Sequence, residues 1–352
     1  MQKLIFTNEV ARELSGLISA ANPHSVYVLA DSNTVMLVWP YLAADCPALS
    51  DARLITVPAG DINKNLDSLS HIWSELQKLG ANRHSMLINV GGGMITDIGG
   101  FAASTFKRGM RFINVPTTLL GAVDASVGGK TGINFGGLKN EIGAFREAEA
   151  VVISTAMFSS LPDSEMYSGY AEMIKHGLLD GEEALTALLA YNPCVHDFNC
   201  MLELLESSVG VKRRVVAEDP TEKGLRKSLN LGHTAGHAFE SLAMEKGAPV
   251  PHGYAVAWGI VVELVLSHMH KGFSTALLRK IAGYVRDHYG VPSITCDDYP
   301  RLLELMHHDK KNLDDRINFT MLEAPGVVAI DSIAGEEDIK VALDIFRDLM
   351  SM

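Results

Sequence analysis

Hydrophobic residues in the first half of the chain follow two alternating patterns. Short runs rich in Val, Ile and Leu, typical of buried β-strands, lie at residues 25–30, 53–58, 85–90, 111–116 and 151–155. Between the second and third of these runs, apolar side chains recur at helical spacing from Leu66 to Leu79, and Gly80 ends the segment. Strand and helix patterns that alternate in this way predict a mostly parallel sheet with crossover helices.

The pattern changes after Pro162, where long helical patterns take over and continue to about residue 308. Short β-like runs at 316–322 and 326–330 predict a small hairpin, and a final helix is expected from about Gly335. A chain of 352 residues exceeds the usual size of one hydrophobic core. We therefore expect an α/β domain with a mostly parallel sheet at residues 1–160 and a mainly α-helical domain at residues 161–352, with one doubly wound domain as the alternative.

Composition limits the class of partner. The chain is 47% hydrophobic and 20% charged, which is typical of globular proteins, and its net charge of −12 disfavours nucleic acid. A small anionic substrate would need a locally basic pocket. The four cysteines show no C-x-x-C spacing. The apolar run at residues 255–266 is interrupted by Glu263 and is too short for a membrane span, which needs about 20 apolar residues. The amino terminus shows no secretion signal, so a cytoplasmic protein is expected.

A glycine cluster follows the third strand-like run. The sequence INVGGGMITDIGGFAAS places Gly91, Gly92 and Gly93 between an apolar strand and an Ala-rich helix. Glycines at that point let backbone amides and a helix N-terminus approach a pyrophosphate, because a Cβ would block the approach. The alternative is a tight turn that needs positive φ. The spacing does not match the G-x-G-x-x-G of an ordinary dinucleotide fold.

A second glycine-rich stretch covers residues 115–145. It contains two lysines that could bind an anionic ligand in this acidic protein. The alternative is that both lysines lie on a solvated surface. Open α/β sheets place ligands at the carboxyl ends of their strands, which favours the first interpretation. The polar residues of this stretch are Thr117, Thr118, Asp124, Lys130, Lys139 and Asn140.

The second half carries an acidic and a histidine motif. Glu172 and Lys175 share one face of an apolar helix, so they either pair with each other, or Glu172 binds a metal while Lys175 reaches a substrate. His233 and His237 are one helical turn apart, and His252 follows. The H-E-x-x-H glutamate is absent, so a zincin protease fits poorly, whereas Glu172 and histidines can form a three-ligand site. Spacing alone leaves open which histidines are ligands.

Six sequence blocks together closely resemble the 3-dehydroquinate synthase family over nearly the whole chain. They are GGGMITD, VPTTLL with VDASVGGKT, LKNEIGAF, GYAEMIKHGLL, GLRKSLNLGHTAGHAFE and HGYAVAWG. The resemblance implies a Rossmann-like N-terminal domain, a mostly helical C-terminal domain and an active site in the cleft between them. It also implies NAD and a divalent metal, usually zinc with cobalt as a possible substitute.

The resemblance assigns individual residues to the cofactors. It implies that Glu172, His233 and His252 hold the metal, and that His237 takes part in proton transfer or substrate contact. Asp61 stands where the family usually has Glu, so its ribose contact is less firmly implied. The implied NAD contacts are Asp31, Asn33, Asp61, Lys64, Gly93, Met94, Ile95, Thr96, Asp97, Thr117, Thr118, Lys130, Lys139, Met157, Phe158, Ser159 and Ser160.

The resemblance also implies a substrate set and a reaction. Lys310 is preferred over Lys311 as a substrate contact, and Arg108 is expected to reach the substrate phosphate across a homodimer. The other implied catalytic and substrate residues are Asp124, Lys130, Lys139, Asn140, Glu172, Lys175, Lys212, Arg226, Asn230 and His237. The implied reaction converts 3-deoxy-D-arabino-heptulosonate 7-phosphate into 3-dehydroquinate and phosphate, the second step of the shikimate pathway. It combines oxidation, phosphate elimination, reduction, ring opening and aldol closure, with no net redox change.

Three alternatives compete with this function. A related cyclase, such as a 2-epi-5-epi-valiolone or 2-deoxy-scyllo-inosose synthase, would use the same chemistry on another sugar. The substrate set, including Lys212, Asn230 and His237, keeps the dehydroquinate synthase pattern, which disfavours this alternative. A metal-dependent polyol dehydrogenase would form NADH and would not need several cations. An inactive binding protein is disfavoured because the ligands and the cationic residues are all present.

Overall fold

The computed structural model describes residues 2–195, 197–307 and 317–351. These residues form two compact units. Unit 1 contains the described residues of Met1–Pro162 and Val195–Glu206, and unit 2 contains those of Asp163–Cys194 and Ser207–Met352. The short stretch from Val195 therefore groups with the first 162 residues, although it lies far along the chain.

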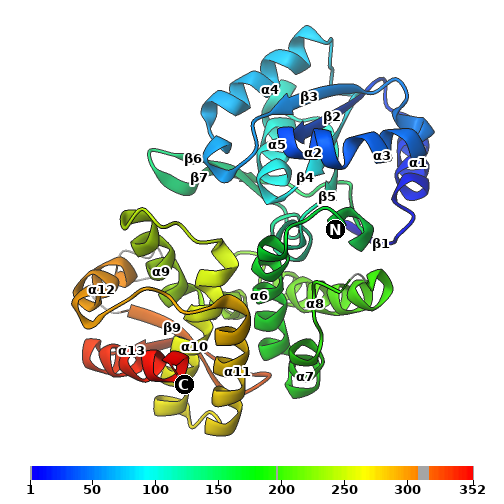
Figure 1. The fold of residues 1–352 in the computed structure, drawn as a ribbon. Coiled ribbons are helices and arrows are strands. Elements are labelled where there is room, and N and C mark those ends of the chain that lie inside the picture. The colour runs from blue at the N-terminus through cyan, green and yellow to red at the C-terminus, as the bar shows by residue number, and fades with distance from the viewer. Residues whose placement is uncertain (1, 196, 308–316, 352) are drawn as a thin grey trace. The chain divides into compact units, whose positions relative to one another are not determined.

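Unit 1 is built on a six-stranded sheet (Figure 1) in the order β1-β8-β5-β4-β2-β3, and every neighbouring pair is parallel. Its strands are β1 (Lys3–Phe6), β2 (Val26–Asp31), β3 (Arg53–Val57), β4 (Met86–Gly91), β5 (Arg111–Pro116) and β8 (Ala150–Ile153). The predicted parallel sheet and its five strands are confirmed. Sequence analysis missed β1, since it has only four residues and none of them is fully buried.

Helices cover both faces of this sheet. On one face, α4 (Leu66–Lys78) and α5 (Gly93–Thr105) bury Leu69, Ile72 and Ile98 against strand residues such as Leu87. On the other face, α1 (Val10–Ala21) and α3 (Trp39–Asp45) bury residues such as Leu14 against Val28 and Ile88. The central strands are therefore apolar on both sides, which explains their continuous hydrophobic runs. The other short helices are α2 (Ser32–Leu37), η1 (Pro47–Leu49), η2 (Asp61–Asn63), η3 (Phe106–Arg108), η4 (Gly121–Ala125) and η5 (Thr155–Phe158).

The glycine-rich stretch after η4 forms an antiparallel hairpin that sequence analysis treated as loop. Strand β6 (Lys130–Phe135) pairs with β7 (Leu138–Phe145), and Gly136 and Gly137 make the turn with φ of 60° and 83°. Gly132 and Gly143 lie opposite each other, and a Cβ at Gly143 would come within 2.1 Å of a backbone oxygen. These last two glycines therefore permit close strand approach, and the exposed β7 gives no buried apolar pattern from which a strand could be predicted.

Unit 2 is mainly helical, as predicted, and ends in a hairpin and a helix. The hairpin of β9 (Ile317–Ala324) and β10 (Val327–Ala334) is antiparallel, which confirms the predicted pair of strands. The helical elements are α6 (Asp163–Asp180), α7 (Glu182–Ala190), α8 (Phe198–Glu218, in this unit from Ser207), η6 (Leu225–Asn230), α9 (His233–Glu245), α10 (His252–Lys271), α11 (Thr275–Tyr289), η7 (Cys296–Asp298), α12 (Tyr299–His307) and α13 (Glu336–Ser351).

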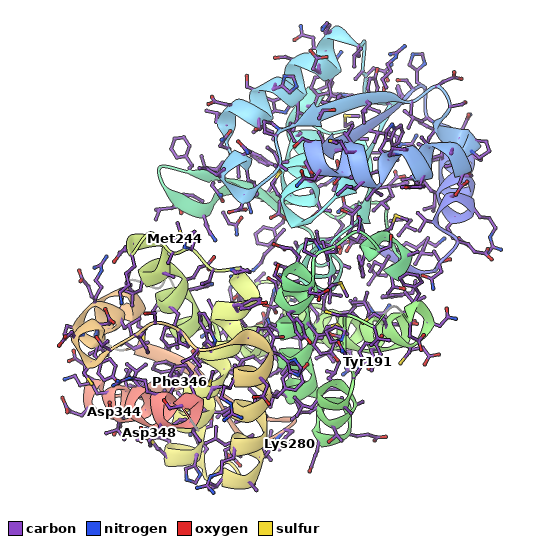
Figure 2. The ribbon with its side chains drawn as sticks, viewed as in Figure 1. Tyr191, Met244, Lys280, Asp344, Phe346 and Asp348 are labelled. Atoms are coloured by element: carbon purple, nitrogen blue, oxygen red, sulfur yellow. The ribbon has the colours of Figure 1, made fainter. Side chains whose placement is uncertain are left out.

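Helix α10 lies at the centre of unit 2 and packs against α6, α9, α11, α13 and β9. Close packing depends on glycine: a Cβ at Gly253 would come within 1.9 Å of Ser168 O, and one at Gly259 within 2.0 Å of Gly232 O. Helix α13 carries Phe346, which is labelled in Figure 2. Its side chain is buried, and its ring stacks on that of Phe239 with the ring centroids 5.6 Å apart. Among the described residues, no helix combines the length and apolarity needed to cross a membrane.

Candidate active site

The carboxyl edge of the unit 1 sheet gathers the residues predicted to bind a dinucleotide. Strand β2 ends at Asp31, β3 leads to η2 and Lys64, and β4 leads to the start of α5 at Gly93. Strand β5 leads to Thr117, and β8 leads to η5 and Met157. Because the strands are parallel, these five segments share one edge, which is the usual ligand edge of an open α/β sheet.

The glycines at the start of α5 permit close packing and do not adopt positive φ. Gly92 is the N-cap with an extended backbone, and neither Gly91 nor Gly93 has positive φ. A Cβ at Gly92 would come within 2.9 Å of Thr118 Cγ2. The positive-φ alternative is therefore wrong, and the glycines instead bring the loop after β5 against the start of the helix. The first turn of α5 also carries the positive end of the helix dipole.

A buried lysine organises polar groups at the same edge. Lys64, 5% exposed, reaches Asp97 Oδ2 at 3.1 Å and Asn140 Oδ1 at 2.7 Å through its Nζ. Asp61 Oδ1 lies 3.4 Å from the same nitrogen. Burial raises the pKa of Asp97 to about 6, although the charge of Lys64 opposes that rise. The structure thus brings together four predicted residues from three segments of unit 1.

Other predicted residues of unit 1 lie on other elements than the group around Lys64. Asp31 caps α2, where its Oδ1 accepts hydrogen bonds from the amides of Asn33 and Thr34 at 2.9 Å. Asp124 lies in η4, and Lys130 begins β6. Arg108 lies between the end of α5 and the start of β5, at the edge of the sheet opposite the carboxyl ends. Within unit 1, Arg108 is therefore not brought to the other predicted substrate residues.

In unit 2, three helices bring Glu172, His233 and His252 together. Glu172 on α6 is 1% exposed, and its Oε1 lies 3.5 Å from His233 Nε2 and 3.8 Å from His252 Nε2. Lys175, one turn along α6 and 2% exposed, forms an ion pair with Glu172 Oε2. Apart from this ion pair, neither oxygen of Glu172 accepts a hydrogen bond from the part of the chain that the structure describes. A buried carboxylate in this condition is suited to hold a cation.

The two histidines present the same ring nitrogen to Glu172. His233 Nδ1 lies 3.1 Å from Leu231 O, and His252 Nδ1 lies 3.1 Å from Glu240 Oε2. Carbonyl and carboxylate oxygens only accept, so both Nδ1 atoms donate, and in the neutral imidazole each Nε2 then carries the lone pair. Two imidazole lone pairs and one carboxylate oxygen therefore face one small volume, which is the donor set of a catalytic zinc site.

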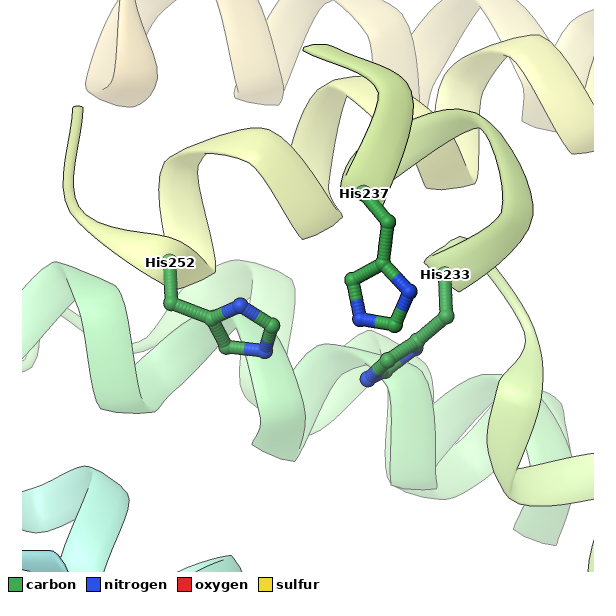
Figure 3. Close-up of side chains that lie close together, drawn as sticks. All are labelled: His233, His237 and His252. Carbon is green, nitrogen blue, oxygen red and sulfur yellow. The ribbon is translucent and has the colours of Figure 1, made fainter. Parts of the chain in front are cut away.

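His237 belongs to the same group of rings. Figure 3 shows the rings of His233 and His237 from α9 beside that of His252 from the start of α10. The ring centroid of His237 lies 5.3 Å from that of His233 and 5.9 Å from that of His252. One nitrogen from each of the three rings lies within 4.8 Å of the others. Geometry therefore permits a three-histidine set as well as the set with Glu172.

The N-terminus of α9 is fixed by a carboxylate from the next helix. Glu263 of α10 is fully buried and accepts hydrogen bonds from the amides of Gly232 at 2.7 Å and Thr234 at 3.1 Å. Gly232 has φ of 78°, and a Cβ there would come within 2.5 Å of Ile260. Sequence analysis treated Glu263 only as an interruption of an apolar run. Its place beside the first residue of α9 shows that it holds the backbone that carries His233.

The remaining residues of the predicted substrate set are largely buried cations and an amide. Lys212 on α8 is 6% exposed, and Arg226 in η6 is 4% exposed and donates to Pro220 O at 2.9 Å. Asn230 Nδ2 lies 3.4 Å from Glu222 Oε1. Lys310 lies outside the described residues. Sequence analysis missed His176, a fully buried α6 residue whose Nδ1 lies 2.8 Å from Ser208 Oγ.

Comparison with known proteins covers nearly the full chain. The family model described as 3-dehydroquinate synthase N-terminal matches residues 54–168, and the C-terminal model matches residues 169–312. A 3-dehydroquinate synthase of Parabacteroides distasonis is 46% identical over 347 residues, which cover 99% of this chain and 98% of the relative. The 3-dehydroquinate synthase of Pyrococcus furiosus is 40% identical over 85% of this chain and 86% of the relative.

Solved structures share the fold at lower identity. A 2-epi-5-epi-valiolone synthase from Streptomyces hygroscopicus, with NAD+ and Zn2+ bound, has a TM-score of 0.85 and 22% identity, covering 99% of this chain and 97% of that chain. A 2-deoxy-scyllo-inosose synthase complexed with carbaglucose-6-phosphate, NAD+ and Co2+ has a TM-score of 0.82 and 22% identity, covering 98% and 96%. Since the two family models adjoin and the 46% identity extends over almost all of the sequence, this chain belongs to the 3-dehydroquinate synthase family.

Proposed function

We propose that the protein is a 3-dehydroquinate synthase, a lyase that converts 3-deoxy-D-arabino-heptulosonate 7-phosphate into 3-dehydroquinate and phosphate. The observation that carries the proposal is the group of Glu172, His233 and His252 in a chain 46% identical to a 3-dehydroquinate synthase. The related cyclases among the solved structures are only 22% identical. That difference favours the dehydroquinate branch over the valiolone and inosose branches.

Glu172, His233 and His252 would hold the divalent metal. The fit rests on the buried oxygens of Glu172 and on the two Nε2 lone pairs that face them. Three protein ligands leave further coordination positions for substrate hydroxyl oxygens. When bound, the metal supplies Lewis-acid polarisation of those oxygens. His237 would then be left to accept or donate a proton beside the ligands, since its ring lies 5.3 Å from that of His233.

Lys175 would keep a positive charge next to the substrate oxygens. Its ammonium is 2% exposed and paired with Glu172, so the cation is held in a fixed place before substrate arrives. A buried ammonium is costly unless an anion compensates it. With Glu172 serving as a metal ligand, the ammonium would be available to an electron-rich substrate oxygen. This arrangement supports the assignment of Lys175 to the catalytic set.

The carboxyl edge of the unit 1 sheet would bind NAD. The start of α5 offers amides and a positive dipole end to the pyrophosphate, and Gly92 and Gly93 leave no Cβ in the way. Asp97, on the same helix, pairs with Lys64. When bound, NAD supplies a hydride acceptor that later returns the hydride, so the reaction has no net redox change.

Cationic residues would bind the substrate anions. Lys130 and Lys139 of unit 1, and Lys212 and Arg226 of unit 2, supply positive charge in a chain whose net charge is −12. Charge-assisted hydrogen bonds from such residues are the strong contacts for phosphate and carboxylate. We assign Asp124, Asn140 and Asn230 to the same substrate-binding set, together with Lys310, by family resemblance.

We also propose a homodimer in which Arg108 serves the partner's substrate phosphate. The support is its position at the amino-end edge of the sheet, which separates it from the carboxyl edge of its own unit 1. Mixing Arg108→Ala with an otherwise inactive His252→Ala subunit tests this. Recovery of part of the activity on mixing supports exchange across subunits, and a mixture no more active than its components contradicts it.

Substrate choice tests the proposed function directly. Purified protein with NAD and zinc is given the heptulosonate phosphate, a heptulose 7-phosphate without the carboxylate, or glucose 6-phosphate. We expect phosphate release from the first compound alone, because the carboxylate-binding cations have no partner in the others. Faster release from either of the others would move the protein to another branch of the cyclases.

A further inference from the structure

Glu240 contacts a candidate metal ligand from the side away from Glu172. It lies on α9, and its Oε2 is 3.1 Å from His252 Nδ1 at the start of α10. The side chain of Glu240 is 11% exposed and that of His252 is 28% exposed. Glu240 follows His233 and His237 by seven and three residues, so all three lie on one face of α9.

We propose that Glu240 is a positioning residue that sets the ring orientation, tautomer and metal affinity of His252. The proposal rests on the metal site of the proposed function and adds a residue outside its three ligands. A carboxylate accepts hydrogen bonds only, so the proton of the neutral imidazole sits on Nδ1. The Nε2 lone pair then points toward Glu172 Oε1, 3.8 Å away.

The two histidine ligands differ in the group behind them. The ring of His233 donates to a backbone carbonyl, Leu231 O, whereas the ring of His252 donates to the charged carboxylate of Glu240. A carboxylate makes the imidazole a more basic ligand than a neutral carbonyl does. His252 is therefore the more basic of the two histidine ligands. The negative charge of Glu240 also favours the binding of a divalent cation.

A purely structural role explains the position of Glu240 less well. A charged side chain at a largely buried site costs desolvation free energy, which an apolar residue of similar volume would avoid. On the same helix, Glu245 is 44% exposed and pairs with Arg301 at 2.6 Å, as an ordinary surface carboxylate does. The hydrogen bond to His252 offsets part of this cost, and a bound divalent cation would offset more of it.

Zinc affinity of the substrate-free protein tests the proposal. Apoprotein is prepared with a chelator, and the Kd for zinc is measured by competition with a chromophoric chelator. We expect Glu240→Ala to weaken zinc binding roughly 10- to 100-fold, the range found for such outer partners. Glu240→Gln keeps an acceptor without the charge, so a smaller loss is expected. The matched control Glu245→Gln should bind zinc as the parent does.

Two further readouts separate positioning from folding. The thermal unfolding midpoint of apo Glu240→Gln should match that of the parent, and its Co2+-loaded form should show an altered ligand-field spectrum. Suppose that both Glu240 variants bind zinc as the parent does, while His252→Ala loses zinc. This result would overturn the positioning role of Glu240 and leave the metal site itself intact. Parent-like zinc affinity in His252→Ala would instead overturn the metal site on which the inference rests.

Discussion

Each unit contains a buried lysine paired with a carboxylate, and the two pairs differ in what completes them. In unit 1, Lys64 pairs with Asp97 and also donates to Asn140, at side-chain exposures of 6% and 17% for the ion pair. In unit 2, Lys175 pairs with Glu172, at exposures of 2% and 1%, and two histidine nitrogens face the same carboxylate. In unit 1, the group beside the Lys64–Asp97 pair is the side-chain amide of Asn140, which contacts the lysine. In unit 2, the Lys175–Glu172 pair lies beside two histidine nitrogens that can bind a cation together with Glu172.

The difference reflects the elements that carry each pair. At the strand ends of unit 1, backbone amides and glycines would supply much of the proposed NAD binding, and charged side chains would support them. In unit 2, side chains on packed helices provide the donors, so their positions depend on the helix packing around Gly232, Gly253 and Gly259. Substitutions in unit 2 should therefore have larger effects than those in unit 1.

The largest effect is expected for His252→Ala. Loss of one of three ligands should abolish zinc binding and reduce kcat/KM by about 1000-fold or more, because Lewis-acid stabilisation of the transition state is lost. Metal content by mass spectrometry and phosphate release check both effects. His270→Ala, on the same helix at an exposed position, is the control. Full metal occupancy with normal turnover in His252→Ala would contradict the ligand assignment.

Glu263→Ala should destabilise unit 2 by about 3 kcal/mol, because three buried amides at the start of α9, those of Gly232, Thr234 and Ala235, lose their acceptor. Denaturant unfolding of the apoprotein measures this loss. Glu337→Ala, in an exposed pair with Lys340, serves as the control and should change stability by less than about 0.5 kcal/mol. Equal stability of the two variants would show that the Glu263 cap contributes little.

Gly92→Ala should weaken NAD binding by about 30-fold without removing a charged group. The added methyl would meet Thr118 at 2.9 Å, so the loop after β5 must move away from the start of α5. Calorimetric titration with NAD measures the change. Gly16→Ala in α1 is the matched control, since its Cβ would meet no atom within 4 Å. An unchanged NAD affinity would mean that the close approach of the two segments is not needed for binding.

Lys139→Ala should raise KM for the heptulosonate phosphate by about tenfold and leave kcat within a few-fold, as expected for the loss of one charge-assisted contact. Steady-state kinetics of phosphate release check the division between KM and kcat. Lys78→Ala, an exposed lysine paired with Glu75 in the same unit, is the control. A loss confined to kcat would assign Lys139 to the chemical step instead.

The smallest effect is a change of ionisation in unit 1. The pKa of Asp97 is raised from 3.8 to about 6 by burial, so its carboxyl should titrate with a midpoint near 6 in carbon-13 NMR of the free protein. Because the folded-state pKa is raised, the contribution of this group to the free energy of unfolding falls as pH rises from about 4 to about 6. Lys64→Met should raise the midpoint further. A midpoint near 4 would show that Asp97 is well solvated.

Most of the fold could be predicted from the sequence because its signals are local. Central parallel strands read as continuous apolar runs, and the final hairpin and helix keep clear patterns. The hairpin of β6 and β7 could not be predicted, since glycine packing and an exposed strand replace the usual alternation. Residues Val195–Glu206 group with unit 1 through contacts between segments far apart in the sequence, which a local sequence pattern does not predict.

The candidate site was predictable only in part. Residue type and spacing identified Glu172 and the histidines, but their convergence depends on how α6, α9 and α10 pack, which spacing does not encode. Glu240 could have been found, because it continues the face of α9 that carries His233 and His237. The capping role of Glu263 could not, since its partners are backbone amides of another helix.

In the proposed reaction, one chain oxidises and then reduces the same substrate while it eliminates phosphate. The direct measurement supplies zinc-loaded protein with the heptulosonate phosphate and far less NAD than substrate, and follows phosphate and nicotinamide absorbance together. We expect many phosphates to be released per NAD, with no accumulation of NADH. Phosphate that stops at one equivalent per NAD, or NADH that accumulates with turnover, would contradict it.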